Sequence, residues 1–195
     1  MSHSIPYDAG RIISLWASLQ YHLLPVKQLD HSTTVYIALG TNLGDRRLNL
    51  SRAIALLQER IDVQQRSSVY ETEAAYVENQ PAFLNMVVRG VIDAAQLTPR
   101  DVLRFVNEVE RRMGRERLVR YGPRLIDVDI LMYGDQQVIE PDLIIPHPRI
   151  VERDFVLAPL REIAPDLILP GQSQTVAELA AALPGIGKVL RVDTL

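Results

Sequence analysis

The stretch YGPRLIDVDILMYG (residues 121–134) carries two patterns at once, one of burial and one of charge. Its second half is rich in large apolar and β-branched residues, which predicts a β-strand packed on a core. Two carboxylates interrupt that strand, Asp127 and Asp129. Side chains two residues apart in a strand lie on one face, so the aspartates are expected to project together, roughly 6–7 Å apart. The residues expected to point the other way, into the core, are Ile126, Val128 and Ile130.

Two neighbouring carboxylates repel each other and are costly to remove from water, so a cation is expected beside them. Mg²⁺ binds through one or two carboxylates together with waters and phosphate oxygens. Asp127 and Asp129 therefore suit a two-metal site of the kind that transfers phosphoryl groups. The alternative is a strand whose solvent-exposed face happens to carry two aspartates, and a D-x-D pattern by itself would favour that alternative.

An arginine-rich segment precedes the aspartates and favours the metal site over the solvent-exposed strand face. Its arginines are Arg111, Arg112, Arg115, Arg117, Arg120 and Arg124. Gly114 and Gly122 allow a loop here to move, and mobile arginines beside paired carboxylates suit a polyphosphate that is clamped by a closing lid. For Arg111 and Arg112 the simpler interpretation is preferred, which is a basic helix C-terminus stabilised by the helix dipole.

The apolar spacing on either side of this strand predicts the order strand, helix, strand, strand, helix, strand. The expected strands are residues 35–40, 63–73, 82–93 and 125–134. The expected helices follow Asp45 and Thr98 as N-caps, and the second ends before Gly114. This order is typical of the split βαβ, ferredoxin-like fold, so we predict an α+β domain with a mainly antiparallel sheet and helices packed on it. One further helix is expected within residues 146–170, and another from Thr175, where Glu178 completes a capping box.

The composition is that of an ordinary globular protein, 47% hydrophobic and 23% charged. The net charge of −3 gives no overall attraction to nucleic acid or to anionic membranes. The lack of cysteine excludes disulfides, thiol nucleophiles and thiolate metal sites, and it fits a reducing compartment. No apolar run approaches the ~20 residues that span a bilayer, so a cytoplasmic location is expected.

Five segments, in this order, resemble the 6-hydroxymethyl-7,8-dihydropterin pyrophosphokinase family of folate biosynthesis. They are YIALGTNLGD (36–45), SSVYETE (67–73), NQPAFLNMVV (79–88), RYGPRLIDVDIL (120–131) and PHPRIVERDFVLAPLREIAPDL (146–167). The resemblance implies an ATP- and Mg-dependent transferase that moves the β,γ-pyrophosphoryl group of ATP to the hydroxymethyl group of the pterin. It further implies two Mg²⁺ ions held by Asp127 and Asp129, with Arg115 and Arg124 stabilising the phosphates.

The resemblance also implies the residues that contact each substrate. The pterin is expected to bind through Thr72, Phe83, Asn85 and Phe155. Stacking between two aromatic faces suits a flat ring, and an amide suits its mixed donor–acceptor edge. ATP is expected to contact Glu110, Arg115, Arg117, Arg120, Arg124, Ile130, His147 and Arg153. Tyr121 is expected to pack over the closed site as part of the lid. A phenylalanine is more often a core residue, and that interpretation is kept for Phe105.

Three parts of the chain are expected: residues 1–33 as a weakly helical or disordered appendage, 34–170 as the pyrophosphokinase domain, and 171–195 as a C-terminal helical tail. The expected partners are ATP and hydroxymethyl dihydropterin, with no nucleic acid and no membrane. We expect a monomer, with a homodimer as the alternative.

Two other functions share some of these features. A nucleotidyl-transfer enzyme would also use D-x-D and two metals, but it needs a basic channel for a polynucleotide, which this acidic chain does not offer. An RNA-binding module with the same element order needs stacking aromatics on its central strands, and these strands carry few.

Overall fold

The computed structural model describes residues 31–73, 80–114, 122–184, 189–193 and 195. The chain divides into Met1–Asp30 and His31–Leu195, and every described residue belongs to the second unit. Of the expected N-terminal appendage, only residues 31–33 are described, and the last two of these begin the first strand.

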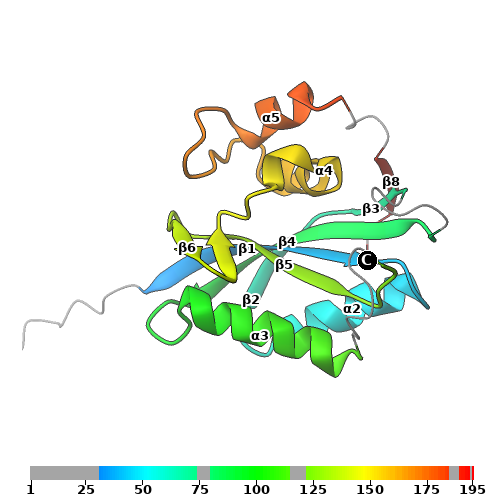
Figure 1. The fold of residues 1–195 in the computed structure, drawn as a ribbon, viewed down its shortest axis with the longest axis horizontal. Helices are drawn as coiled ribbons and strands as arrows, with labels where there is room; N and C mark the ends of the chain where they lie inside the picture. Colours follow the sequence, from blue (N-terminus) through cyan, green and yellow to red (C-terminus); the bar gives the residue numbers. More distant parts are fainter. Residues whose placement is uncertain (1–30, 74–79, 115–121, 185–188, 194) are drawn as a thin grey trace, which may run out of the picture. The chain divides into compact units, whose positions relative to one another are not determined.

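Six strands of the described chain form one sheet (Figure 1). They are β1 (Ser32–Thr41), β2 (Asp62–Arg66), β3 (Val69–Thr72), β4 (Phe83–Asp93), β5 (Asp127–Tyr133) and β8 (Leu190–Asp193). The order is β5-β1-β4-β3-β8, β2 also pairs with β4, and all pairings are antiparallel. Because β2 and β3 together take the place of one strand, the core has the ferredoxin-like order, and the predicted α+β class is confirmed.

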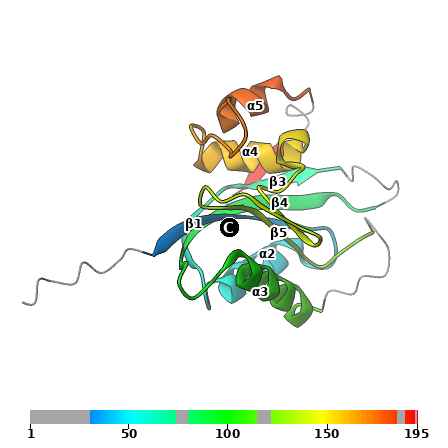
Figure 2. The ribbon, with the colours of Figure 1, turned by 60° about the vertical axis from the view of Figure 1, so that its left-hand side comes forward.

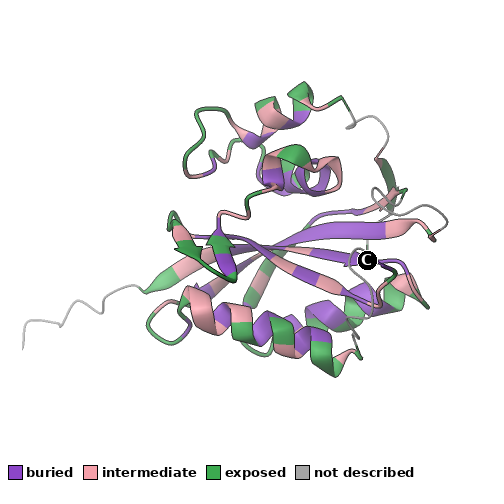
Figure 3. Ribbon diagram, in the orientation of Figure 1, coloured by how far each residue is buried: buried purple, intermediate pink, exposed green. Residues whose placement is uncertain are grey.

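Helices cover both faces of this sheet (Figures 1 and 2). On one face lie α2 (Arg46–Leu57) and α3 (Pro99–Arg112), and on the other lie α4 (Asp154–Ile163) and α5 (Val176–Ala182). Side chains of β1 point alternately to the two faces of the sheet. Val35 and Ile37 therefore lie in the core with α2 and α3, while Tyr36 lies in the core with α4. Figure 3 shows the buried residues concentrated in these two layers.

The predicted helix ends are confirmed. Asp45 accepts from the backbone N–H of Leu48 at the start of α2, and Thr98 forms a capping box with Asp101 at the start of α3. Gly114 follows α3 with φ of 80°, a conformation that glycine adopts at little cost. No described helix is both long enough and apolar enough to pass through a membrane.

The single strand predicted over residues 63–73 is broken in the structure into β2 and β3. Ser67 lies at the break, where its side-chain oxygen accepts from the backbone N–H of Val87 at 3.0 Å in place of a carbonyl. Glu162 of α4 accepts from the backbone N–H of Ser68 at 2.9 Å. Polar side chains therefore satisfy backbone groups here, which periodicity alone does not predict.

Four short elements were not predicted: β6 (Val138–Glu140), β7 (Leu143–Ile145), the 3₁₀ turn η1 (Ile150–Glu152) and β8. β6 and β7 form a hairpin whose strands are too short to show an alternation of apolar and polar residues. Arg100 of α3 forms ion pairs with Glu140 and Asp142 of this hairpin. The helix predicted within residues 146–170 is α4, and the helix predicted from Thr175 is α5. The tail expected to be helical thus also contributes a strand to the sheet.

Candidate active site

The sheet face beneath α4 changes from large to small side chains along β1. Tyr36 lies in the core under α4, but the next two residues on that face are Ala38 and Gly40. Gly40 pairs with Asn85 of β4 on one side and with Asp127 of β5 on the other. Ala38 has the second aspartate as its neighbour on β5. The small residues therefore form a floor bordered by the polar side chains of two strands.

A cavity opens above this floor, and it collects most of the residues that the sequence predicted. Those in its wall are Thr72, Phe83, Asn85, Arg124, Asp127, Asp129, Arg153 and Phe155. All four residues predicted to hold the pterin thus come together with both aspartates and two arginines.

Two aromatic rings of this cavity each lie beside an arginine. Phe83 begins β4, and its ring centroid is 5.9 Å from the guanidinium carbon of Arg124. Phe155 lies in the first turn of α4, and its ring centroid is 5.5 Å from the guanidinium carbon of Arg153. Phe105, in contrast, is buried in the core between the sheet and α3, as predicted.

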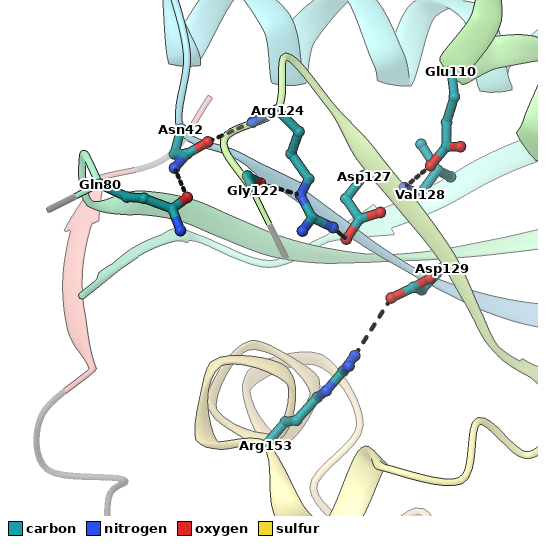
Figure 4. A network of polar contacts seen from close by, with 9 residues as sticks. All are labelled: Asn42, Gln80, Glu110, Gly122, Arg124, Asp127, Val128, Asp129 and Arg153. Atoms are coloured by element: carbon teal, nitrogen blue, oxygen red, sulfur yellow. Dashed lines mark hydrogen bonds and ion pairs between the residues drawn. The ribbon is translucent and has the colours of Figure 1, made fainter. Parts of the chain in front are cut away.

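The same two arginines hold the two aspartates (Figure 4). Arg124 Nη1 donates to Asp127 Oδ2 at 2.6 Å, and Arg153 Nη1 donates to Asp129 Oδ2 at 3.5 Å. The aspartate side chains are 27% and 38% exposed, whereas Val128 between them is buried in the core. The prediction that the aspartates share one face of the strand is therefore confirmed.

The Asn85 amide is fixed in one orientation. Its Nδ2 donates to Thr72 Oγ1 at 2.8 Å, which uses one of its donors. Its Oδ1 lies over Gly40, so near that a methyl group on Gly40 would be 3.1 Å away. Part of the amide therefore remains available to a ligand on this floor.

Arg153 has an unusual environment for a cation. Its side chain is only 14% exposed, and its Nε is buried without a hydrogen-bond partner among the described residues. A buried guanidinium N–H without an acceptor is costly, so an anionic or carbonyl group of a ligand would stabilise it.

A second cavity lies on the other side of the aspartates, between α3 and the β6–β7 hairpin. The predicted residues in its wall are Glu110, Asp127, Asp129, Ile130 and His147. Both aspartates therefore belong to both cavities. Arg124 and Arg153, predicted to contact ATP, line the first cavity.

His147 is a neutral donor in this second cavity. Burial lowers its pKa to about 4, with further contributions from Arg153 and Arg149, so the ring is uncharged at pH 7. Its Nδ1 accepts from the backbone N–H of Arg149 at 3.1 Å, which leaves the proton on Nε2. Glu110 fixes β5 beside it, because its Oε1 accepts from the backbone N–H of Val128 at 2.8 Å.

Four predicted residues, Arg115, Arg117, Arg120 and Tyr121, lie outside the described residues. The interpretation of this segment as a lid therefore remains a prediction.

Several residues of the site were not predicted, among them Ala38, Gly40, Asn42 and Gln80. Small residues at alternate positions in VYIALG (35–40) were a usable signal for the floor of the cavity. No local signal pointed to Asn42, whose partners lie 38 or more residues away in the sequence.

The donor set suits a hard divalent cation. Asp127 and Asp129 present carboxylate oxygens on one face, and both are accessible from two cavities. In the described part of the chain no three acidic or histidine side chains cluster as metal ligands. An ion at the aspartates would therefore take its other ligands from water and from a bound phosphate, as Mg²⁺ commonly does.

Residues 36–165 match the family model of 7,8-dihydro-6-hydroxymethylpterin-pyrophosphokinase (HPPK). The 2-amino-4-hydroxy-6-hydroxymethyldihydropteridine pyrophosphokinase of Bacillus subtilis is 45% identical over 130 residues, which cover 66% of this chain and 76% of that protein. The Aquifex aeolicus protein of the same name is 41% identical over 137 residues, which cover 70% of this chain and 84% of that protein.

Longer proteins contain a similar region. A folate synthesis bifunctional protein of Arabidopsis thaliana is 47% identical over 131 residues, which cover 66% of this chain but only 26% of that protein. The chain therefore spans about a quarter of the length of such longer relatives. Among solved structures, HPPK-DHPS of Plasmodium falciparum superposes with a TM-score of 0.65 at 17% identity, covering 80% of this chain and 46% of that chain. At that identity the likeness supports the fold alone.

Proposed function

The chain belongs to the 7,8-dihydro-6-hydroxymethylpterin-pyrophosphokinase family, and from that premise we propose that it transfers the pyrophosphoryl group of ATP to 6-hydroxymethyl-7,8-dihydropterin. The products are AMP and the pterin pyrophosphate of folate biosynthesis. The observation that carries this proposal is the position of Asp127 and Asp129 in a wall shared by two cavities. A nucleotide in one cavity and a pterin in the other would meet at these carboxylates.

The first cavity is the proposed pterin site. Phe83 and Phe155 offer aromatic faces on which a flat bicyclic ring gains stacking energy. Asn85, held by Thr72, presents its amide to the polar edge of the ring, and Gly40 leaves space for that edge. Arg153, which was expected to contact ATP, also lies in this wall, and its Nε has no hydrogen-bond partner among the described residues.

The second cavity is the proposed nucleotide site. His147 offers a neutral N–H, and Glu110 and Ile130 form part of the wall toward α3. Mg²⁺, in two ions as the family resemblance implies, would neutralise and orient the phosphates beside Asp127 and Asp129.

The chemical step needs positioning and charge neutralisation more than covalent catalysis. The pterin hydroxyl oxygen bonds to the β-phosphorus while the bond from that phosphorus to the oxygen of the α-phosphate breaks, and AMP leaves. Asp127 is the candidate acceptor of the hydroxyl proton. Arg124 reaches Asp127 in the structure, which supports its proposed contact with phosphate oxygens beside that carboxylate. Arg115, Arg117, Arg120 and Tyr121 are proposed to close over the phosphates as a lid.

Release of AMP tests this function. Purified protein should form AMP and not ADP from ATP when the hydroxymethyl dihydropterin and Mg²⁺ are both present, and it should form neither when EDTA is added. AMP formation independent of the pterin, or transfer of a single phosphate, would contradict the proposal.

A further inference from the structure

Asn42 lies directly after the last residue of β1, and only 2% of its surface is exposed. Its side chain bonds to two segments that are far apart in the sequence (Figure 4). Oδ1 accepts from the backbone N–H of Arg124 at 2.8 Å. Nδ2 donates to Gln80 Oε1 at 3.3 Å and to the carbonyl of Pro81 at 3.2 Å. One buried amide thus connects the segment that leads into β4 with the segment that leads into β5.

The segment before β5 carries the arginine that holds the first aspartate. The backbone N–H of Asn42 donates to the Arg124 carbonyl at 3.1 Å, so the backbone of Arg124 is fixed on both its sides. Arg124 Nε then donates to the Gly122 carbonyl at 3.2 Å, and Nη1 reaches Asp127. The direction of the guanidinium toward Asp127 therefore depends on a backbone that Asn42 holds.

The segment before β4 carries the wall of the first cavity. Gln80 is itself part of that wall, and Pro81 lies two residues before Phe83. A shift of Gln80 and Pro81 would move the aromatic side of the cavity relative to Asp127. Asn42 is not among the residues that line either cavity, so it acts only through its neighbours.

We infer that Asn42 is a positioning residue that holds the pterin-side wall at a fixed position relative to Arg124. As a result, binding of a ligand in either cavity favours binding of a ligand in the other. The inference rests on the proposed function, because it assigns the two cavities to pterin and nucleotide. Its physical basis is that a small misplacement of two reacting groups lowers the rate strongly even when each group still binds. A coupling between two sites must also appear as a reciprocal change in affinity.

Asn49 provides a matched control. It is also a buried asparagine of the same region, and its Nδ2 donates to the Leu43 carbonyl at 2.8 Å and to Thr41 Oγ1 at 3.4 Å. These partners lie at the end of β1 and in the turn that follows it, so the loss of Asn49 affects stability without uncoupling Gln80 from Arg124. Asn42→Asp keeps the acceptor for Arg124 but removes both donors, and Gln80→Ala removes one acceptor at a partly exposed position.

The experiment measures the dissociation constant of the hydroxymethyl pterin with and without Mg²⁺ and a non-hydrolysable ATP analogue, together with kcat and KM. We expect the analogue to tighten pterin binding in the unaltered protein. In Asn42→Ala and Asn42→Asp the ratio of the pterin dissociation constants without and with the analogue should fall toward one. The kcat should fall roughly 10- to 100-fold with a smaller change in KM. Gln80→Ala should show the same changes in weaker form. Asn49→Ala should change neither kcat nor the effect of the analogue on pterin binding.

The inference would be overturned if the two ligands bind independently to the unaltered protein. It would also be overturned if Asn49→Ala and Asn42→Asp lose kcat, and the effect of the ATP analogue on pterin binding, to the same extent. If Asn42→Ala does not fold, Asn42→Asp and Gln80→Ala decide the question. Unaltered protein that binds neither ligand would instead overturn the proposed function. This inference alone would be overturned if the unaltered protein turns over normally and the Asn42 and Gln80 variants match it in kcat and in the effect of the ATP analogue on pterin binding.

Discussion

Arg124 forms an ion pair with Asp127, with 2.6 Å between Nη1 and Oδ2. Arg153 stands in a similar relation to Asp129, and each arginine also lies beside one of the two aromatic rings. A divalent cation that bound both carboxylates would replace these pairs and leave both guanidinium groups to phosphate oxygens. Under the proposed function, the two arginines would then exchange a carboxylate partner for a phosphate partner.

We expect Arg124→Gln to separate metal binding from catalysis. Loss of a positive charge beside Asp127 should tighten binding of Mn²⁺ alone several-fold, since like charges no longer repel at this site. Turnover should fall by roughly 100-fold or more, because the phosphates lose a charge-assisted donor. Mn²⁺ titration followed by electron paramagnetic resonance and the AMP assay measure the two effects. Arg112→Gln, which removes an exposed pair with Glu59, is the control and should change neither.

We expect Asp129→Asn to remove turnover without removing the pterin. The amide keeps the size of the side chain but loses the charge that a divalent cation needs, so kcat should fall by roughly 100-fold or more. Pterin affinity measured without nucleotide should stay within a few-fold of normal, because Phe83, Asn85 and Phe155 remain in place. Near-normal turnover in this variant would refute a metal-binding role for Asp129.

The fold was accessible from the sequence because its signals are local. The apolar residues that alternate with Asp127 and Asp129 fixed the face of β5, and Thr98, Pro99 and Gly114 fixed the ends of α3. The two aspartates and the small residues of β1 also lie on regular strands, where spacing determines the face.

The remaining parts depend on contacts between distant segments. Ser67 breaks a strand because its hydroxyl and Glu162 replace ladder bonds, and nothing in the neighbouring residues predicts that partner. β8 has four residues and forms only by pairing with β3. Asn42 joins segments 38 and 82 residues away, so its role depends on tertiary structure and not on a periodic pattern.

We expect Gly40→Ala to weaken pterin binding roughly 10-fold, because crowding in a packed wall costs about 1–3 kcal/mol and each ~1.4 kcal/mol is tenfold in affinity. Nucleotide binding should stay nearly unchanged. The added methyl group would lie 3.1 Å from Asn85 Oδ1, on the floor of the first cavity. Gly90→Ala is the complementary variant, since its methyl group would lie 2.4 Å from Cγ2 of Ile61 in the core. That variant should lower the free energy of unfolding by about 1–3 kcal/mol through overpacking. Equal pterin affinity in Gly40→Ala and the unaltered protein would contradict the proposed floor.

The last prediction concerns His147 and the dependence of stability on pH. Burial, Arg153 and Arg149 lower its folded-state pKa from 6.5 to about 4. The unfolded chain therefore binds a proton more readily than the folded protein, so the folded state loses stability as the pH falls from 6.5 through 4. At pH 4.5 this loss amounts to about 2–3 kcal/mol of unfolding free energy relative to pH 7.5. His147→Gln keeps an acceptor for the Arg149 N–H but cannot be protonated, so its unfolding free energy should fall less over this interval. Urea denaturation of both proteins at the two pH values measures the difference, and identical losses would show that His147 does not resist protonation in the folded protein.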